Sequence, residues 1–295
     1  MFRLDNDNLR AIILMIAASS AFAMKDGFVK SFGGLYPITE ILSAQYTFQF
    51  LLFLPLLLIR YGPSKIFPKK LFLQLLRGIL AIIAVAFFYY SISNIPLADA
   101  TALVFISPLV ITALTPMTFG DKVGVRRWCA VIIGFCGILL IIKPGFEEIN
   151  TGTFAAVAAG IIYAFFQIIT RKLSDEEVPL VTAFFTSAVG CVIANLFLLN
   201  NFIIPSPVDG IMFAGIGLLV AVGQLSLILS LATAPPVVVA PFGYSTIIVA
   251  IAIGYFVFGD IPDLIAMTGI IILILTGIYI AIRESKSEQI RGRIQ

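Results

Sequence analysis

The chain is a succession of long apolar runs separated by short polar segments. A helix that crosses a bilayer needs ~20 apolar residues, and unbroken runs such as 79–90 and 247–258 lack the alternation of membrane β-strands. Backbone polar groups in lipid must bond within their own segment, so these runs predict helices. We expect an all-α integral membrane protein with ten spans, at residues 9–31, 36–59, 71–93, 97–119, 128–142, 152–170, 179–199, 210–232, 237–258 and 264–282.

Two stretches of the sequence resemble each other. Residues 96–121 and 235–260 have equal length, and each opens on a proline and closes on Phe-Gly-Asp. Gly78 and Gly217 precede them at the same distance, and a similar apolar run follows each copy. Internal repetition of this kind indicates a duplication. We therefore predict two units of five helices, at residues 1–146 and 147–295.

The basic residues predict an orientation. Cytoplasmic loops are enriched in Lys and Arg, and with the N-terminus inside, 15 of the 19 such residues fall in inside segments. Lys143 is then the one basic residue in an outside loop, and both termini are cytoplasmic. Because five spans is an odd number, the second unit enters the membrane from the opposite side. Inverted repeats of this kind are typical of secondary carriers, whose substrate binds between the halves.

Composition and motifs exclude several classes of function. The chain is 60% hydrophobic, 12% charged and free of histidine, so histidine-based metal sites and general bases are ruled out. The patterns GxxxxGK[ST], HExxH and GxSxG are absent, which leaves no basis for an enzyme, and we expect no cofactor and no metal. The net charge of +3 is explained by the inside loops and does not indicate a nucleic-acid partner.

Charges inside apolar runs are the first candidates for function, because each costs ~2.5–3.5 kcal/mol to insert. Lys25 and Asp26 interrupt the first predicted helix. As sequence neighbours they point in different directions, so we expect that they do not simply neutralise each other. Asp26 is a candidate ligand for a cationic group or a proton. The alternative is a local ion pair with Lys30, four residues later.

The other charges near span ends have simpler interpretations. Glu40 and Asp99 suit helix N-termini, where the dipole favours an anion. Arg77 is expected to reach lipid headgroups from the inner end of the third helix. Asp121 and Asp260 are expected to be loop or cap residues.

Polar and aromatic residues near mid-span complete the candidates. A polar side chain in a bundle often only bonds a neighbouring helix, for ~0.6 kcal/mol. Proline inside a span frees backbone carbonyls, and such breaks tend to line cavities. We therefore expect Ser107-Pro108 and Pro241 to Tyr244 to wall a midplane site. The other mid-span candidates are Gln45, Tyr89, Tyr90, Tyr163, Gln167, Asn195 and Gln224.

The sequence resembles the EamA family of the drug/metabolite transporter superfamily. The resemblance rests on Arg77-Gly78, residues 96–103, Ser107-Pro108-Leu109, Phe119-Gly-Asp121, residues 127–145, residues 240–244, Phe258-Gly-Asp260, Gly269 and Arg283-Glu284. It covers both halves and implies ten helices in two inverted five-helix repeats around a central cavity. It would place Asp26, Tyr89, Ser107, Tyr163, Gln167, Gln224 and Tyr244 on or near the pathway.

Some positions differ from the family pattern, and the polar cluster of the first helix bears on the substrate. Asp replaces the usual Glu at 121 and 260, and an Arg often found early in the second helix is Gln45 here. The polar cluster of the first helix is similar to that of S-adenosylmethionine carriers in the family, with Lys25 as an added charge.

These observations together predict a secondary transporter that works by alternating access in a bacterial inner membrane. The expected substrate is a small metabolite, such as an amino acid derivative or an S-adenosylmethionine-like cation. A proton or a counter-substrate is a candidate coupling partner, and the protein is expected to be a monomer or a homodimer. The alternatives are a membrane scaffold or assembly protein without a solute pathway, and a channel.

Overall fold

The computed structural model describes residues 6–63, 67–119, 124–143, 150–174, 176–198 and 202–291. Every regular element within these ranges is a helix, and none is a strand. Ten of the helical runs described are long and apolar enough to cross a membrane. The prediction of an all-helical protein with ten spans is confirmed. The Phe-Gly-Asp segment at Gly120 and Asp121 lies outside the described residues.

Eight spans are single helices whose ends agree with the predicted ones to within a few residues, except at the C-terminus. They are α1 (Asn6–Ser31), α2 (Ile38–Tyr61), α3 (Leu71–Ile92), α6 (Val125–Ile142), α7 (Thr151–Leu173), α8 (Pro179–Leu198), α9 (Pro207–Thr233) and α12 (Leu264–Arg291). Proline stands at or just before the start of several of them, where its missing N–H has no intrahelical partner to lose. Helix α12 continues nine residues beyond the predicted end of its apolar run.

The two remaining spans are broken, as their prolines predict. One consists of α4 (Leu97–Val104) and α5 (Ser107–Phe119), separated by a tight turn. The other consists of α10 (Pro236–Val239), the 3₁₀ segment η2 (Ala240–Tyr244), α11 (Ser245–Ile253) and the π segment η3 (Gly254–Phe258). Pro108 and Pro241 have no N–H to donate to the carbonyls four residues earlier, so regular α-helix cannot run through these positions without a lost bond.

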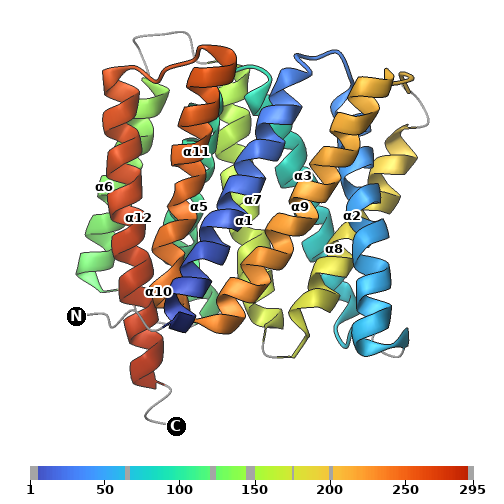
Figure 1. The fold of residues 1–295 in the computed structure, drawn as a ribbon. Helices are drawn as coiled ribbons and strands as arrows, with labels where there is room; N and C mark the ends of the chain where they lie inside the picture. The colour runs from blue at the N-terminus through green and yellow to red at the C-terminus, as the bar shows by residue number, and fades with distance from the viewer. Residues whose placement is uncertain are drawn as a thin grey trace.

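The helices of the two halves of the chain pack against each other in pairs (Figure 1). In the view of Figure 1, α1 and α9 lie in front of α3 and α7, and α1 contacts α9 while α3 contacts α7. Under the duplication that the sequence predicts, α1 would correspond to α7 and α3 to α9, which would make these two pairs equivalent. The two edges of the bundle are α2 with α8 and α6 with α12. Helix α1 begins and α12 ends at the same end of the bundle.

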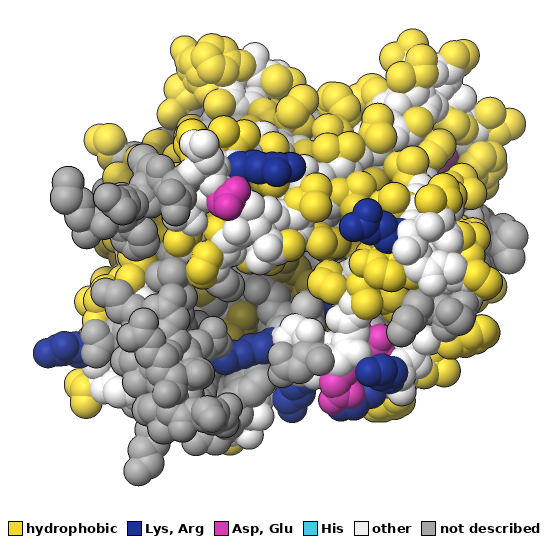
Figure 2. All heavy atoms as spheres, turned by 60° about the horizontal axis from the view of Figure 1, so that its bottom comes forward, with side chains coloured by type: hydrophobic (Ala, Val, Ile, Leu, Met, Phe, Trp, Pro, Cys, Tyr) yellow, Lys and Arg dark blue, Asp and Glu magenta, His cyan; other side chains and the backbone are white. Residues whose placement is uncertain are grey.

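The outer surface of the bundle is apolar. Large hydrophobic side chains are widely exposed, among them Leu264 at 88%, Ile59 at 85% and Phe256 at 81%. Such a surface in water would be an aggregation hazard, whereas lipid solvates it. Figure 2 turns the end where α1 begins toward the viewer and shows Lys and Arg side chains on this end, with hydrophobic side chains around the flanks.

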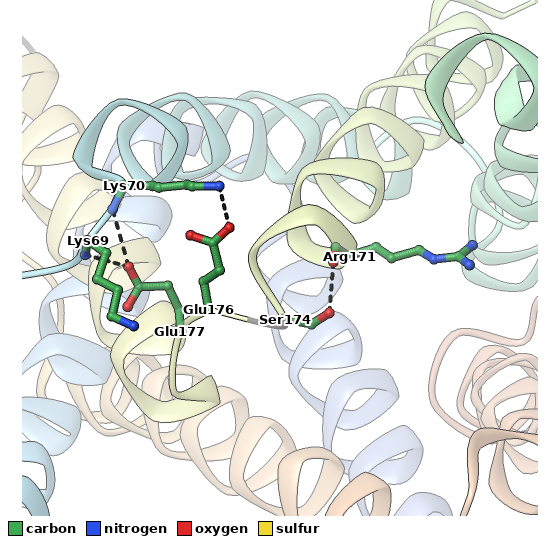
Figure 3. Close-up of polar contacts among 6 residues, drawn as sticks. All are labelled: Lys69, Lys70, Arg171, Ser174, Glu176 and Glu177. Atoms are coloured by element: carbon green, nitrogen blue, oxygen red, sulfur yellow. Dashed lines mark hydrogen bonds and ion pairs between the residues drawn. The ribbon is translucent and has the colours of Figure 1, made fainter. Parts of the chain in front are cut away.

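Polar contacts join loops at both ends of the bundle. At the end where α1 begins, the Lys70 ammonium lies 2.5 Å from the Glu176 carboxylate, and Glu177 accepts the backbone N–H of Lys69 at 2.6 Å (Figure 3). At the opposite end, the Tyr36 hydroxyl donates to Asp209 at 2.8 Å, and this bond raises the pKa of Tyr36 above its usual value. Each contact ties a loop in one half of the chain to a helix start in the other half.

Candidate functional site

A chain of four polar side chains lies inside the bundle, between α1, α2 and α3. Lys25 and Asp26 are only 7% and 5% exposed, and the Lys25 ammonium forms an ion pair with the Asp26 carboxylate. Lys25 also donates to the Tyr89 hydroxyl at 3.2 Å, with its nitrogen 4.7 Å from the centre of that ring. Tyr89 in turn donates to Gln45 Oε1. Asp26, Lys25, Tyr89 and Gln45 are called the α1 cluster below.

The expectation that Lys25 and Asp26 do not neutralise each other is wrong. Their Cα atoms are adjacent, but the four-carbon lysine stem is long enough to return its ammonium to the neighbouring carboxylate. Burial favours this arrangement, because an unpaired charge in a low-dielectric interior is strongly destabilising. Four deeply buried polar side chains in a bonded series are unusual in a membrane bundle, and buried charges there tend to mark substrate or proton pathways.

The local pair of Asp26 with Lys30 is also not found. Lys30 instead reaches Asp260 at 3.0 Å and the carbonyl of Ile95 at 2.9 Å, so it joins α1 to the two broken spans. At the same end of the bundle, Lys143 forms an ion pair with Asp263. Asp263 also accepts the N–H of Ala266 at 2.8 Å, and these two bonds, the backbone one first, lower its pKa below the usual value.

The break before Pro108 brings a second pair of predicted residues together. Gln167 on α7 donates to the Ser107 hydroxyl at 3.4 Å, and Ser107 itself is 3% exposed. Tyr163 lies one turn earlier on α7 and stacks on Phe166, with ring centroids 5.3 Å apart. Ser107 and Gln167 therefore meet where α5 packs against α7, and Tyr163 lies one turn away on α7.

The broken span that contains Pro241 contributes a third set of contacts. The carbonyl of Gly243, in η2, accepts the Ser19 hydroxyl of α1 at 3.3 Å. The Tyr244 ring is 6% exposed and packs on Phe105, at the turn between α4 and α5. Gln224 on α9 is half-buried, and its side chain makes no hydrogen bond to another described residue.

Arg77 does not reach lipid headgroups, which corrects the sequence-based expectation. It is 4% exposed, and its Nε donates to Thr170 on α7 at 2.7 Å. Its Nη1 donates to the Thr182 carbonyl at 2.9 Å and to the Thr186 hydroxyl, both on α8. Arg77 lies six residues after the first residue of α3. At this depth α7 and α8 cover its side chain, so the guanidinium does not reach the membrane interface. A charge within an apolar run was the sequence signal that marked this residue.

The fold and these buried charges define a class: a multi-pass membrane protein with a charged and hydrogen-bonded interior. Comparison with known proteins places it further. Residues 9–143 and 150–283 each match the EamA-like transporter family. The chain belongs to this family.

Several characterised relatives are similar over nearly their whole length. An S-adenosylmethionine uptake transporter of Rickettsia bellii is 26% identical over 93% of each chain. A riboflavin transporter of Vibrio cholerae is 24% identical over 95% of this chain and 96% of its own. A pseudopaline exporter of Pseudomonas aeruginosa is 24% identical, over 92% of this chain and 95% of its own. One solved structure superposes with a TM-score of 0.65 at 16% identity, covering 94% of this chain and 98% of its own, and supports the fold.

Proposed function

We propose that this protein is a secondary transporter that moves a small metabolite across a bacterial inner membrane by alternating access. The observation that carries the proposal is the α1 cluster: two charges and two polar groups, almost fully buried, inside a bundle whose outer face suits lipid. Charges buried at such a position reduce the stability of the fold. In a protein of this family, transport of a polar solute is the function that explains their presence.

The proposed architecture is two inverted five-helix repeats with both termini in the cytoplasm. Three observations support it. The equivalent pairs α1–α9 and α7–α3 pack alike, and α2–α8 and α6–α12 pair each helix with its own copy. Both broken spans fall at the corresponding place in their repeat. The end of the bundle where α1 begins carries most of the Lys and Arg residues of the loops, as the positive-inside rule expects of the cytoplasmic face.

The pathway residues follow from this architecture. Asp26, Lys25 and Tyr89 would form one side of the binding region, and Ser107, Tyr163 and Gln167 the other. Pro108 and Pro241 would provide the flexible breaks, with Gln224 and Tyr244 along the same passage. None of these roles involves a catalytic step, and a proton or a counter-substrate would supply the driving force.

The substrate class that we propose is an amino acid derivative. The relative named for S-adenosylmethionine, a derivative of the amino acid methionine, supports it. A purely cationic ligand matches this site less well than it would match an unpaired carboxylate site. The Asp26 carboxylate that would receive the cation is already neutralised by Lys25. Such a ligand would have to displace the Lys25 ammonium from both the carboxylate and the Tyr89 ring.

The experiment is flux into proteoliposomes that contain the purified protein. S-adenosylmethionine, S-adenosylhomocysteine, methionine and riboflavin are the radiolabelled probes, with protein-free vesicles as the blank. We expect saturable uptake of at least one amino acid derivative, and its loss in Asp26→Asn, with expression unchanged. Normal uptake by Asp26→Asn would remove Asp26 from the pathway.

Two other functions would give different results in the same vesicles. A scaffold or assembly protein would carry none of the probes. A channel would give flux that does not saturate and that far exceeds carrier rates. The buried ion pairs and broken spans favour the carrier over both.

A further inference from the structure

The interior contains a second buried cation besides Lys25, and its hydrogen bonds within the described residues go to neutral groups. Lys25 pairs with Asp26 and Lys30 pairs with Asp260. Arg77, at 4% exposure, has no carboxylate partner among the residues that the structure describes. Its hydrogen bonds go to neutral oxygens of Thr170, Thr182 and Thr186.

The arginine is held in place rather than merely buried. The bonds from Nε and Nη1 fix the guanidinium plane, and its carbon lies 4.4 Å from the centre of the Phe166 ring. No bond from Nη2 is found in the described part of the chain, and this atom is not among the fully enclosed polar atoms without a partner. The Nη2 nitrogen of a fixed guanidinium therefore keeps its donors for a ligand, and a hydrogen bond from a charged donor to a carboxylate is among the stronger ones.

Tyr163 lies on the face of α7 that meets Arg77. It shares this face with Phe166, Gln167 and Thr170, three, four and seven residues later. Phe166 and Thr170 contact Arg77 of α3, and Gln167 contacts Ser107 of α5. Tyr163 is therefore on the side of α7 that packs toward α3 and α5, and its side chain is 39% exposed.

Two phenol rings lie close to the residues that hold Arg77. Tyr163 stacks on Phe166, and the Phe166 ring contacts the guanidinium. Tyr46 contacts α8 four residues after Thr186, which also bonds Arg77. Tyr46 is 2% exposed, and its ring packs against Gly190 of α8, where a larger residue would collide with it. Within the described ranges neither hydroxyl takes part in a hydrogen bond, although a buried phenol normally finds a partner.

We propose that Arg77, with the hydroxyls of Tyr46 and Tyr163, forms an anion subsite that receives a carboxylate of the transported substrate. The inference rests on the proposed transport function and specifies its substrate: a compound that carries a carboxylate. Lys25 and Asp26 would meet the rest of the substrate as a neutral ion pair. The subsite supplies one uncompensated positive charge and two hydroxyl donors, so it selects against a ligand that is only cationic.

The test uses the whole protein in detergent and the simplest carboxylate, acetate. Thermal unfolding midpoints are measured over a sodium acetate series, against sodium chloride at equal ionic strength and acetamide at equal concentration. We expect a saturable rise of the midpoint in acetate beyond that in chloride, and none in acetamide. We expect Arg77→Gln to abolish the acetate-specific rise.

Two further variants keep the result interpretable. Tyr163→Phe removes only a hydroxyl that makes no hydrogen bond within the described residues. This variant should fold normally and bind acetate about tenfold more weakly. Arg60→Gln, at an exposed arginine near the end of α2, should leave the acetate response unchanged. An acetate response that is the same in the wild type, Arg77→Gln and Tyr163→Phe would overturn the proposal, as would a wild-type response equal to that in chloride.

Failure of this proposal is separable from failure of the proposed function. Saturable flux of a probe together with no acetate-specific response would reject the subsite and leave the carrier intact. An Arg77-dependent acetate response without flux of any probe would support the subsite and count against the transport assignment.

Discussion

The rings of Phe105 and Tyr244 pack against each other with centroids 4.7 Å apart and planes inclined by 35°. Each residue stands nine positions after the proline that opens its copy of the repeat, Pro96 or Pro235. A residue and its symmetry-equivalent can meet only where the symmetry axis passes. This contact therefore supports a pseudo-two-fold axis at the junction of the two broken spans, where a carrier with inverted repeats would place its site.

The packing around Tyr244 predicts the effect of enlarging Gly277. A Cβ atom on Gly277 would overlap the Tyr244 hydroxyl, whereas a Cβ atom on Gly243 would meet open space. We expect Gly277→Ala to lower the free energy of unfolding by ~1–3 kcal/mol, as overpacking does, and Gly243→Ala to have little effect. Unfolding in mixed micelles titrated with sodium dodecyl sulfate measures both. Equal stability of the two variants would show that Tyr244 is free to move aside.

The buried Lys25–Asp26 pair predicts a non-additive pair of substitutions. Asp26→Leu leaves the Lys25 ammonium buried without its partner and should cost ~3–5 kcal/mol of unfolding free energy. The double variant Lys25→Met with Asp26→Leu removes both charges and should recover most of that loss. The same micelle titration measures the three proteins. Additive losses would mean that the two charges do not depend on each other.

Asp263 predicts a pH dependence of stability. Its bonds to the Ala266 N–H and to Lys143 lower its pKa below the usual 3.8, so they favour the ionised, folded form. The stabilisation is fully present above the unfolded pKa and is lost as pH falls below about 3.8 toward the lower folded value. Asp263→Asn should lack this part of the decline. The comparison requires unfolding midpoints of both proteins between about pH 2 and pH 6, and parallel curves over this whole range would contradict the assignment.

Two neighbouring glutamates in Figure 3 predict unequal effects. Glu177 accepts the backbone N–H groups of Lys69 and Lys70 at 2.6 and 3.3 Å, at the N-terminus of α3. Glu176 only pairs with an exposed lysine ammonium, a contact worth ~0–1 kcal/mol. We expect Glu177→Ala to destabilise by about 1 kcal/mol, as the loss of a helix cap does, and Glu176→Ala to be nearly neutral. The reverse order of stabilities would show that the ion pair matters more than the cap.

Pro241 predicts an effect on rate and not on affinity. Replacement by alanine restores a backbone N–H and favours regular helix through η2. If the break lets this span bend during transport, Pro241→Ala should lower turnover several-fold in proteoliposomes with little change in the half-saturating substrate concentration. Unchanged turnover would leave the break without a role in transport.

The number of spans and their breaks could be read from the sequence, because both are local properties. Apolar runs of sufficient length predict helices, and Pro108 and Pro241 predict interruptions near their own positions. The pairings of Lys25 and Lys30 could not be read in this way. Which carboxylate a lysine reaches depends on the neighbouring spans, and Lys30 finds Asp260 from the other half of the chain.

The interior position of the Arg77 side chain is a second feature that the sequence could not predict. Its sequence position near a helix start is compatible with a lipid-facing anchor and with an interior residue. The choice depends on whether α7 and α8 cover that face of α3, which the third helix alone does not determine. The candidate residues lie on the helices that the sequence predicts for them, but the partners that surround them are set by packing.

The most direct test of the central claim is access to Tyr163 from each side of the membrane. Cys129, Cys136 and Cys191 are replaced, Tyr163→Cys is introduced, and a membrane-impermeant thiol reagent is applied to oriented vesicles from one side or the other. An alternating-access carrier predicts labelling from both sides, at rates that a transported substrate changes in opposite directions. Labelling from neither side, or from one side alone under every condition, would contradict the account.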